Sequence, residues 1–135
     1  MDFKLDKKHE MARALFQEFA EKEVKPLAQE VDETEQFPKE TVAKMQKLGF
    51  LSIPMPKEYG GQGCDTLTYA MCVEELSKVC ATTGVIVSAH TSLCIDPIMT
   101  FGTEAAPYTH LRAHETLRYL VCRLPLEKKN RSSFT

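Results

Sequence analysis

Residues 85–101 read VIVSAHTSLCIDPIMTF, a run in which apolar side chains would occur on nearly every side of a helix. Such a helix is typically buried by its neighbours on most sides. Pro97 is expected to kink it and Gly102 to end it. The β-branched residues of GVIV (84–87) also permit a short strand, but the helical spacing continues past them and favours the helix. A central helix of this kind predicts other helices packed around it.

Three helices are expected before residue 50. Apolar positions recur at helical spacing after Asp6, which is a suitable N-cap residue. Pro26 is expected to break the chain before a second, short helix that ends near Glu33. A third helix should have Pro38 in its first turn and Gly49 at its C-terminal end.

A fourth helix is expected to begin after Asp65, its N-cap, with a broad apolar stripe over residues 67–79. Glu74, Glu75 and Lys78 should lie outside this stripe. Residues 82–84, TTG, should end the helix. No stretch alternates as a half-buried strand does, so the predicted fold class is all-α, a helical bundle.

The segment PKEYGGQGCD (56–65) joins the third and fourth helices and concentrates three glycines. A phosphate cradle would need a spacing such as G-x-G-x-x-G or a following GK[ST], and neither occurs. The alternative is a tight turn in which glycines take positive φ and Tyr59 packs back on the core. The turn is the favoured interpretation.

Composition points to one domain of ordinary type. The chain has 135 residues, 43% hydrophobic and 27% charged, with a formal net charge of -2. No apolar run is expected to be long enough to cross a membrane, and the first residues show no secretory signal, which predicts a cytoplasmic protein. Residues 1–106 hold 11 basic and 17 acidic side chains, whereas residues 107–135 hold 6 and 2. The charge therefore changes sign near Pro107.

Local chemistry identifies no catalytic centre. The cysteines form no C-x-x-C pair and are expected to be free buried structural thiols, not a disulfide framework or a zinc site: Cys64, Cys72, Cys80, Cys94 and Cys122. His110 and His114 share a helical spacing, but the segment lacks a third ligand, so no metal site is predicted. No Ser, His and Asp set and no pair of carboxylates on an apolar background can be assembled.

Several motifs taken in order resemble a known family. They are FAEKEVKPLAQEVDETEQFP, KMQKLGFLSIPMPKEYGGQG and YAMCVEELSKVCATTGVIVSAHTSLCIDPIMTFGTEA. Together they resemble the N-terminal helical domain of flavin-dependent acyl-CoA dehydrogenases, nearest the bacterial short-chain, butyryl-CoA type. The likeness covers residues 1–106. It implies an all-α domain that, in the full-length family, packs with a β-domain and a C-terminal helical domain around FAD and a fatty acyl thioester.

The resemblance also implies a role for the apolar helix. Its counterpart in the family lines the acyl-chain pocket with positions that fall here on Ile86, Ala89, His90 and Leu93, which helical geometry puts on one face. Ordinary core packing is the alternative for each of the four, and a hydrogen-bonded neutral imidazole is the usual state of a buried histidine. No catalytic residue and no flavin-contacting residue of the family is identified in this chain.

The family reaction removes hydrogens from the α and β carbons of the thioester, with FAD as the hydride acceptor. The implied partners are an acyl-CoA substrate, an electron-transferring flavoprotein and, in a homotetramer, further copies of the chain; neither nucleic acid nor a membrane is expected. The chain alone is expected not to retain FAD and to be inactive.

Residues 107–135 are expected to be an unrelated basic tail. They depart from the family pattern after FGTEA, and a shifted reading frame or a truncated gene, or a disordered segment, is favoured over a membrane-binding or nucleic-acid-binding helix. The leading interpretation is a fragment of a short-chain acyl-CoA dehydrogenase that contributes part of the acyl-binding wall. The alternative is a stand-alone helical module that binds a protein partner through its apolar face.

Overall fold

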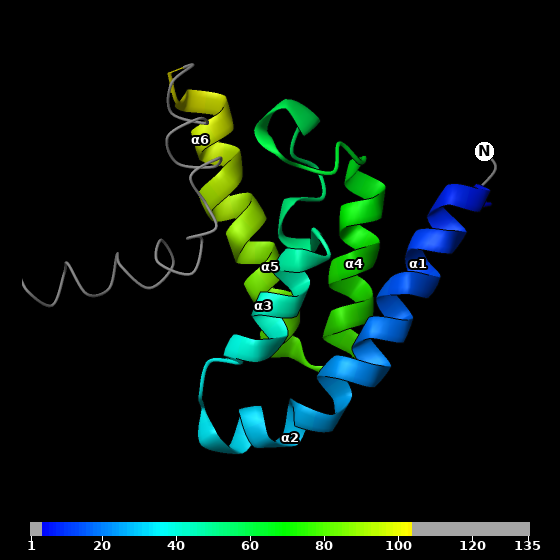
Figure 1. Cartoon of the computed structure of the whole chain (residues 1–135), viewed down its shortest axis with the longest axis vertical. Coiled ribbons are helices and arrows are strands. Elements are labelled where there is room, and N and C mark those ends of the chain that lie inside the picture. The colour runs from blue at the N-terminus through cyan, green and yellow to red at the C-terminus, as the bar shows by residue number, and fades with distance from the viewer. Residues whose placement is uncertain (1–3, 104–135) are drawn as a thin grey trace, which may run out of the picture.

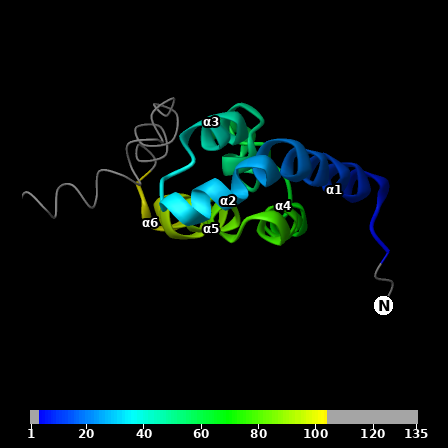
Figure 2. The same cartoon turned by 90° about the horizontal axis from the view of Figure 1, so that it is seen from below.

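Every regular element in the described part of the chain is a helix, which confirms the predicted all-α class. The computed structural model describes residues 4–103. In Figure 1, α4 (Thr66–Val79) lies between α1 (Lys7–Phe19) and α5 (Ala81–Ala89). Figure 2 shows α3 (Lys39–Lys47) on the side of α1 and α2 (Lys25–Thr34) that faces away from α4 and α5.

The two predicted N-caps are confirmed. The Asp6 side chain accepts a hydrogen bond from the backbone N–H of His9, and Asp65 accepts one from the backbone N–H of Thr68. Each carboxylate thus satisfies an amide that has no partner within its own helix. These caps set where α1 and α4 begin.

The prolines act differently from the prediction. Residues 7–34 continue without a break, because a π-helical turn, Ala20–Val24, joins α1 to α2 and places Pro26 in the first turn of α2. A second π-helical turn, His90–Ile95, joins α5 to α6 (Asp96–Phe101) and places Pro97 in the same way. A proline in a regular α-helix would clash with the carbonyl four residues earlier, and a π turn directly before it widens the helix. The predicted break at Pro26 is therefore a bend (Figure 1), and the predicted kink at Pro97 coincides with the second π turn.

The connection between α4 and α5 also differs from the prediction. α4 ends at Val79, a single extended residue, Cys80, follows, and residues 82–84 lie inside α5 instead of ending α4. Gly84 is needed inside the helix because a Cβ there would lie 1.9 Å from the Ser77 hydroxyl oxygen of α4. The glycine marks a close approach of two helices and not a helix end.

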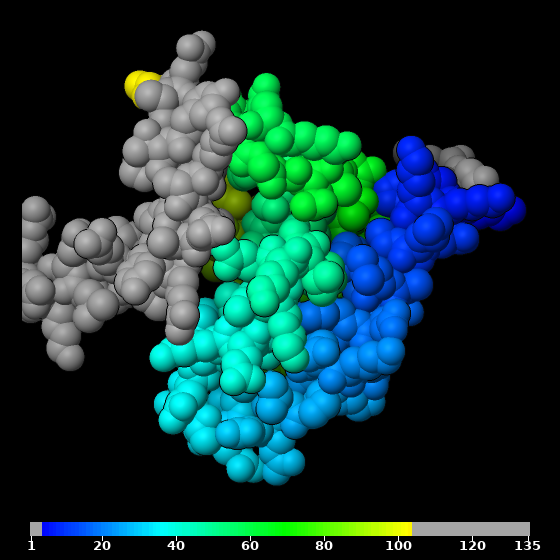
Figure 3. Space-filling model, in the orientation of Figure 1, coloured from blue at the N-terminus to red at the C-terminus, as the bar shows by residue number. Residues whose placement is uncertain are grey.

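The loop between α3 and α4 is wound tightly. Gly49 follows α3 with a φ of 76°, and two short 3₁₀ turns, Phe50–Ser52 and Lys57–Tyr59, lead to the glycine-rich segment. In the space-filling view, α3 and the residues that follow it lie on the front face of the molecule, beside α1 (Figure 3).

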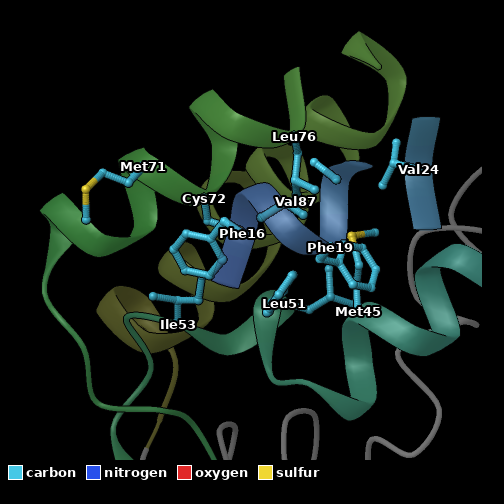
Figure 4. Close-up of a cluster of buried hydrophobic side chains, with 12 residues drawn as sticks. Phe16, Phe19, Val24, Met45, Leu51, Ile53, Met71, Cys72, Leu76 and Val87 are labelled. Carbon is cyan, nitrogen blue, oxygen red and sulfur yellow. The ribbon is translucent and has the colours of Figure 1, made fainter. Parts of the chain in front are cut away.

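The main core gathers between α1, α3, α4 and α5 (Figure 4). At its centre Phe50 meets the rings of Phe16 and Phe19 edge to face, with centroids 5.1 and 5.0 Å away. The remaining buried members are Ala20, Val24, Met45, Leu51, Ile53, Met71, Cys72, Leu76 and Val87. A smaller cluster of Met55 and Ile95, with Tyr59 packed against it, attaches the glycine-rich loop to the second π turn, which confirms the expected packing of Tyr59.

The continuous helix Ala81–Phe101 is less buried than predicted. Val87 is fully buried, but Val85 is 62% exposed, Leu93 76% and Phe101 85%. The described neighbours cover one side of this helix only. The helix is also 21 residues long and contains an 18-residue window with a mean hydropathy of 1.3, so the expectation that no run is long enough to cross a membrane is wrong by length and composition. The core helix of a soluble domain passes the same test.

Candidate functional site

The glycine-rich loop uses its own backbone amides. The N–H groups of residues 60–64 donate in turn to the carbonyls of Lys57, Pro56, Ser52, Met55 and Ile53, at 2.9–3.1 Å. An anion cradle needs such N–H groups free to point at the anion. Gly60 and Gly63 take the positive φ expected of a turn, and a Cβ on Gly61 would lie 2.0 Å from the Met55 carbonyl oxygen. The loop is a turn, as predicted, and holds no phosphate through its glycines.

The four predicted acyl-pocket residues separate into two pairs. Ile86 packs against the main core and His90 is only 3% exposed, so both point into the domain. Ala89 is half-buried and Leu93 is 76% exposed. With Val85, these two residues recur every four positions and form an apolar stripe on the outer side of the helix, here named the outer stripe: Val85, Ala89 and Leu93.

The second π turn explains why Leu93 lies on the outer side. The N–H of Asp96 donates to the carbonyl of Thr91, five residues earlier, so the helix is wider here than an α-helix. Positions after His90 are therefore turned relative to ideal α-helical spacing. The buried residue that follows His90 and Thr91 on the inner side is Ile95, and Leu93 falls outside.

Thr91 was not singled out from the sequence. Its side chain is 5% exposed, and its hydroxyl oxygen finds no hydrogen-bond partner within the described part of the chain. A buried hydroxyl without a partner is unfavourable and calls for an explanation. A threonine next to a buried histidine in an apolar helix was the available signal.

A cluster of ion pairs joins α1 to α4. Glu75 is 4% exposed, and Arg13 contacts it through Nε at 3.2 Å while its Nη2 lies 2.6 Å from Glu74. Lys78 lies 2.8 Å from Glu75 and 3.0 Å from Glu74. Glu75 was predicted only to lie outside the apolar stripe; it is nevertheless buried, and cations from α1 and from its own helix pair with it. Hydrogen bonding by Lys78, followed by the nearby Arg13 charge, holds the pKa of Glu74 below its usual value.

The described residues, 4–103, contain no candidate metal site. Among residues 4–103 no three His, Cys, Asp or Glu side chains are arranged to hold a metal ion. Cys64, Cys72, Cys80 and Cys94 are free thiols, as predicted, but of these only Cys72 is buried; Cys80 and Cys94 are half-buried, and the prediction of burial is wrong for the exposed Cys64. Burial raises the pKa of Cys72 to about 12, so it stays protonated and inert. The predictions for Cys122, for His110 and His114, and for the basic tail fall outside the described residues.

The glycine-rich loop does not fit the pyrophosphate of a flavin dinucleotide. Such a group needs unoccupied backbone amides or facing cations, and the amides of the glycine-rich loop are all hydrogen-bonded within the loop. What this part of the chain presents is the outer stripe, an apolar surface suited to a hydrocarbon or to an apolar protein surface.

Comparisons with known proteins find similar sequences over most of the chain. Residues 6–113 match the family model of the acyl-CoA dehydrogenase N-terminal domain. The chain is 57% identical over 111 residues to the short-chain specific acyl-CoA dehydrogenase of Clostridium acetobutylicum, which covers 82% of the chain and 29% of the relative. Against the mitochondrial short-chain specific enzyme of Homo sapiens the identity is 45% over 100 residues, covering 74% and 24%.

Solved structures show the same fold. Butyryl-CoA dehydrogenase from Megasphaera elsdenii superposes with a TM-score of 0.77 and 36% identity, covering 83% of this chain and 30% of that one. A chain in a structure of the electron transferring flavoprotein of Acidaminococcus fermentans superposes at 0.79 with 43% identity and the same coverage. The chain thus spans less than a third of the length of these relatives. The family match extends to residue 113, whereas the predicted domain boundary lies at residue 106 and stays a prediction.

The helical fold, the glycine-rich turn and these matches lead to one conclusion: the chain belongs to the acyl-CoA dehydrogenase family and corresponds to its N-terminal domain.

Proposed function

We propose that this chain supplies the N-terminal helical domain of an FAD-dependent dehydrogenase that forms a double bond between the α and β carbons of short-chain acyl-CoA thioesters. The observation that carries the proposal is the outer stripe. On its most apolar helix this family domain leaves Val85 and Leu93 exposed, with the half-buried Ala89 between them at the same spacing of four.

Covering an apolar stripe of this kind is energetically favourable, because it removes apolar surface from water. Burying a valine or leucine side chain contributes about 1.5–3 kcal/mol, so leaving Val85 and Leu93 in water forgoes a favourable term. An acyl chain is a suitable cover because it is apolar, narrow and able to lie along a helix. In this proposal Ala89 and Leu93 contact the acyl tail, whereas Ile86 and His90 support the helix from inside the domain.

The chain's own contribution is to bind and orient. When bound, FAD supplies the hydride acceptor of the reaction. The apolar wall excludes water from the carbon chain and limits its length, which positions the thioester for proton removal. We assign neither the base nor the flavin-binding residues to residues 4–103, and we propose that the 135-residue chain alone neither retains FAD nor catalyses.

Partners belong to the same proposal. A chain 43% identical to this one occurs in a structure of an electron transferring flavoprotein, which supports that class of protein as the electron acceptor. Assembly as a homotetramer and a cytoplasmic location remain predictions.

A domain exchange tests the proposal. Residues 6–103 of this chain replace the matching segment of the C. acetobutylicum short-chain specific enzyme, and the chimera is assayed for bound flavin by absorbance and for oxidation of butyryl-CoA. The expected result is a flavin-loaded chimera active on butyryl-CoA. A folded chimera that holds FAD but is inactive on butyryl-CoA, while its unmodified parent is active, would contradict the proposal.

The second candidate, a stand-alone interaction module, would use the same outer stripe. Gel filtration of the 135-residue chain with excess FAD tests whether the chain retains the cofactor. Stoichiometric flavin eluting with the chain would overturn the proposed lack of retention. A single, concentration-independent unfolding transition of a monomeric chain would favour the module, because a domain lacking its apolar cover should self-associate.

A further inference from the structure

His9 lies between two carboxylates from distant parts of the chain. Its Nδ1 is 2.7 Å from an oxygen of Asp6, and its Nε2 is 2.8 Å from an oxygen of Asp65. The histidine side chain is only 17% exposed, although both aspartates are more than half exposed. The imidazole is thus held in a fixed place between the first turn of α1 and the first turn of α4.

Both carboxylates are committed as ionised hydrogen-bond acceptors. Asp65 accepts from the backbone N–H and the hydroxyl of Thr68, which, with His9, lowers its pKa to about 2. The backbone N–H of His9 is the main cause that lowers the pKa of Asp6. An ionised carboxylate offers only acceptors.

A neutral imidazole cannot satisfy this geometry. It has one N–H and one lone pair, so one of its nitrogens would face a carboxylate oxygen with no proton between them. The imidazolium donates from both nitrogens and completes both contacts. Of the charged groups in the described part of the chain, those that act on the ring are Asp6, on its own helix cap, and Asp65, from α4.

We propose that His9 is a pH-dependent clamp: as the imidazolium it fastens the N-terminus of α1 to the N-terminus of α4, and its deprotonation frees the first turn of α1 while the core stays packed. The fully buried residues of α1 begin at Phe16, and on either side of its first turn only the partly buried Leu5 and Ala12 pack against the main core. The next ion pair to α4 is made by Arg13, one turn later.

The direction of the pH dependence follows from the two carboxylates. The hydrogen bond to Asp65, and then the charges of Asp6 and Asp65, raise the pKa of His9 above its ordinary value of 6.5. The stabilisation is therefore complete below pH 6.5 and is lost as the pH rises through the raised pKa of the folded state. On the acid side, the part due to Asp65 is lost only as the pH falls toward about 2.

NMR of the full 135-residue chain, labelled with ¹⁵N, tests the clamp. We expect His9 to titrate above 6.5 with both ring nitrogens protonated below that pKa. Hydrogen exchange at the backbone amides of residues 10–13, corrected for the intrinsic pH dependence, should become roughly threefold to tenfold faster through the titration. The amide of Leu76, in the core of α4, should show no such step. A His9 pKa at or below 6.5, or exchange in α1 that does not follow the titration, overturns the proposal.

Asp65→Asn is the matched variant. Asparagine keeps the N-cap of α4 but carries no charge, so the fold is retained while the clamp is weakened. We expect the His9 pKa to fall toward 6.5 and exchange in the first turn of α1 to lose its pH step. His9→Gln should give fast exchange in that turn at every pH. If His9→Gln keeps the pH step of the parent chain, His9 is not the group responsible; if Asp65→Asn keeps it at an unchanged pH, Asp65 is not the partner that clamps α1 to α4. Either result overturns the proposal.

Discussion

The guanidinium Nε of Arg13 in α1 lies 3.2 Å from a carboxylate oxygen of Glu75 in α4, and among residues 4–103 Glu75 is the buried acid. Removing one partner of a buried pair leaves a charge with incomplete compensation. Arg13→Ala is therefore expected to lower the free energy of unfolding by about 2–4 kcal/mol, since Lys78 still neutralises part of the charge. Urea unfolding followed by circular dichroism measures this.

The control for this substitution is Lys22→Ala. Lys22 pairs with Glu18 on the exposed surface of the same continuous helix, where water screens the pair. Its removal should leave the unfolding midpoint nearly unchanged. Equal losses for Arg13→Ala and Lys22→Ala would show that burial of Glu75 does not matter.

Phe50 is expected to be the most sensitive aromatic residue of the core. It is 2% exposed and contacts the rings of both Phe16 and Phe19. Phe50→Ala should reduce stability by about 3–5 kcal/mol by opening a cavity between α1 and the loop after α3. Phe37→Ala makes the same chemical change at a ring that is 39% exposed and should cost less than about 1.5 kcal/mol. Similar losses at both positions in urea unfolding would contradict the described core.

Thr91 should behave in the opposite way. Thr91→Val removes a buried hydroxyl that has no partner in the described part of the chain, at nearly constant volume, and is expected to stabilise by about 1 kcal/mol. Thr68→Val is the matched control, because the Thr68 hydroxyl donates to Asp65 at 2.7 Å and its loss should destabilise. Thermal unfolding of the two variants should shift in opposite directions; a lower midpoint for Thr91→Val would show that its hydroxyl is hydrogen-bonded.

Features set by neighbouring residues could be predicted from the sequence. Asp6 and Asp65 were identified as N-caps because a cap depends on amides only three residues away. The turn at Gly60 and Gly63 was identified from the glycine spacing, which is also local and does not match an anion cradle. These are local properties of the chain.

Features set by packing could not be predicted. The TTG sequence at residues 82–84 resembles a helix end, and only the close approach of Ser77 shows that Gly84 is required inside α5. A proline in the sequence predicts that a helix is disturbed, but it does not show whether the helix breaks or contains a π turn. At Pro26 and at Pro97 the structure has a π turn. The ion pair between Arg13 and Glu75 joins side chains of two helices brought together by folding, which spacing along one helix does not show.

The candidate site could be predicted only in part, because its geometry also depends on structure that the sequence pattern does not show. Ideal helical spacing puts Ile86, Ala89, His90 and Leu93 on one face, and the π turn that starts at His90 changes that spacing. Only Ala89 and Leu93 share the outer side with Val85. Which residues reach a ligand thus depends on a local change in helix width that periodicity does not reveal.

The acyl wall itself can be examined in the chimeric enzyme by substituting Ala89. Ala89→Leu adds three carbons to the outer stripe, and a hydrophobic pocket discriminates each methylene by about 1–3 kcal/mol. Val87→Ala is the control, because Val87 is fully buried in the core and its truncation should lower stability without changing chain-length preference.

The most direct measurement is the ratio of kcat/KM for butyryl-CoA to that for octanoyl-CoA, taken for the chimera and its Ala89→Leu variant alongside their thermal unfolding midpoints. If the outer stripe lines the acyl pocket, Ala89→Leu should raise this ratio by at least about tenfold, with little change in the midpoint. An unchanged ratio in a destabilised protein would show that Ala89 is ordinary packing and would contradict the proposed acyl wall.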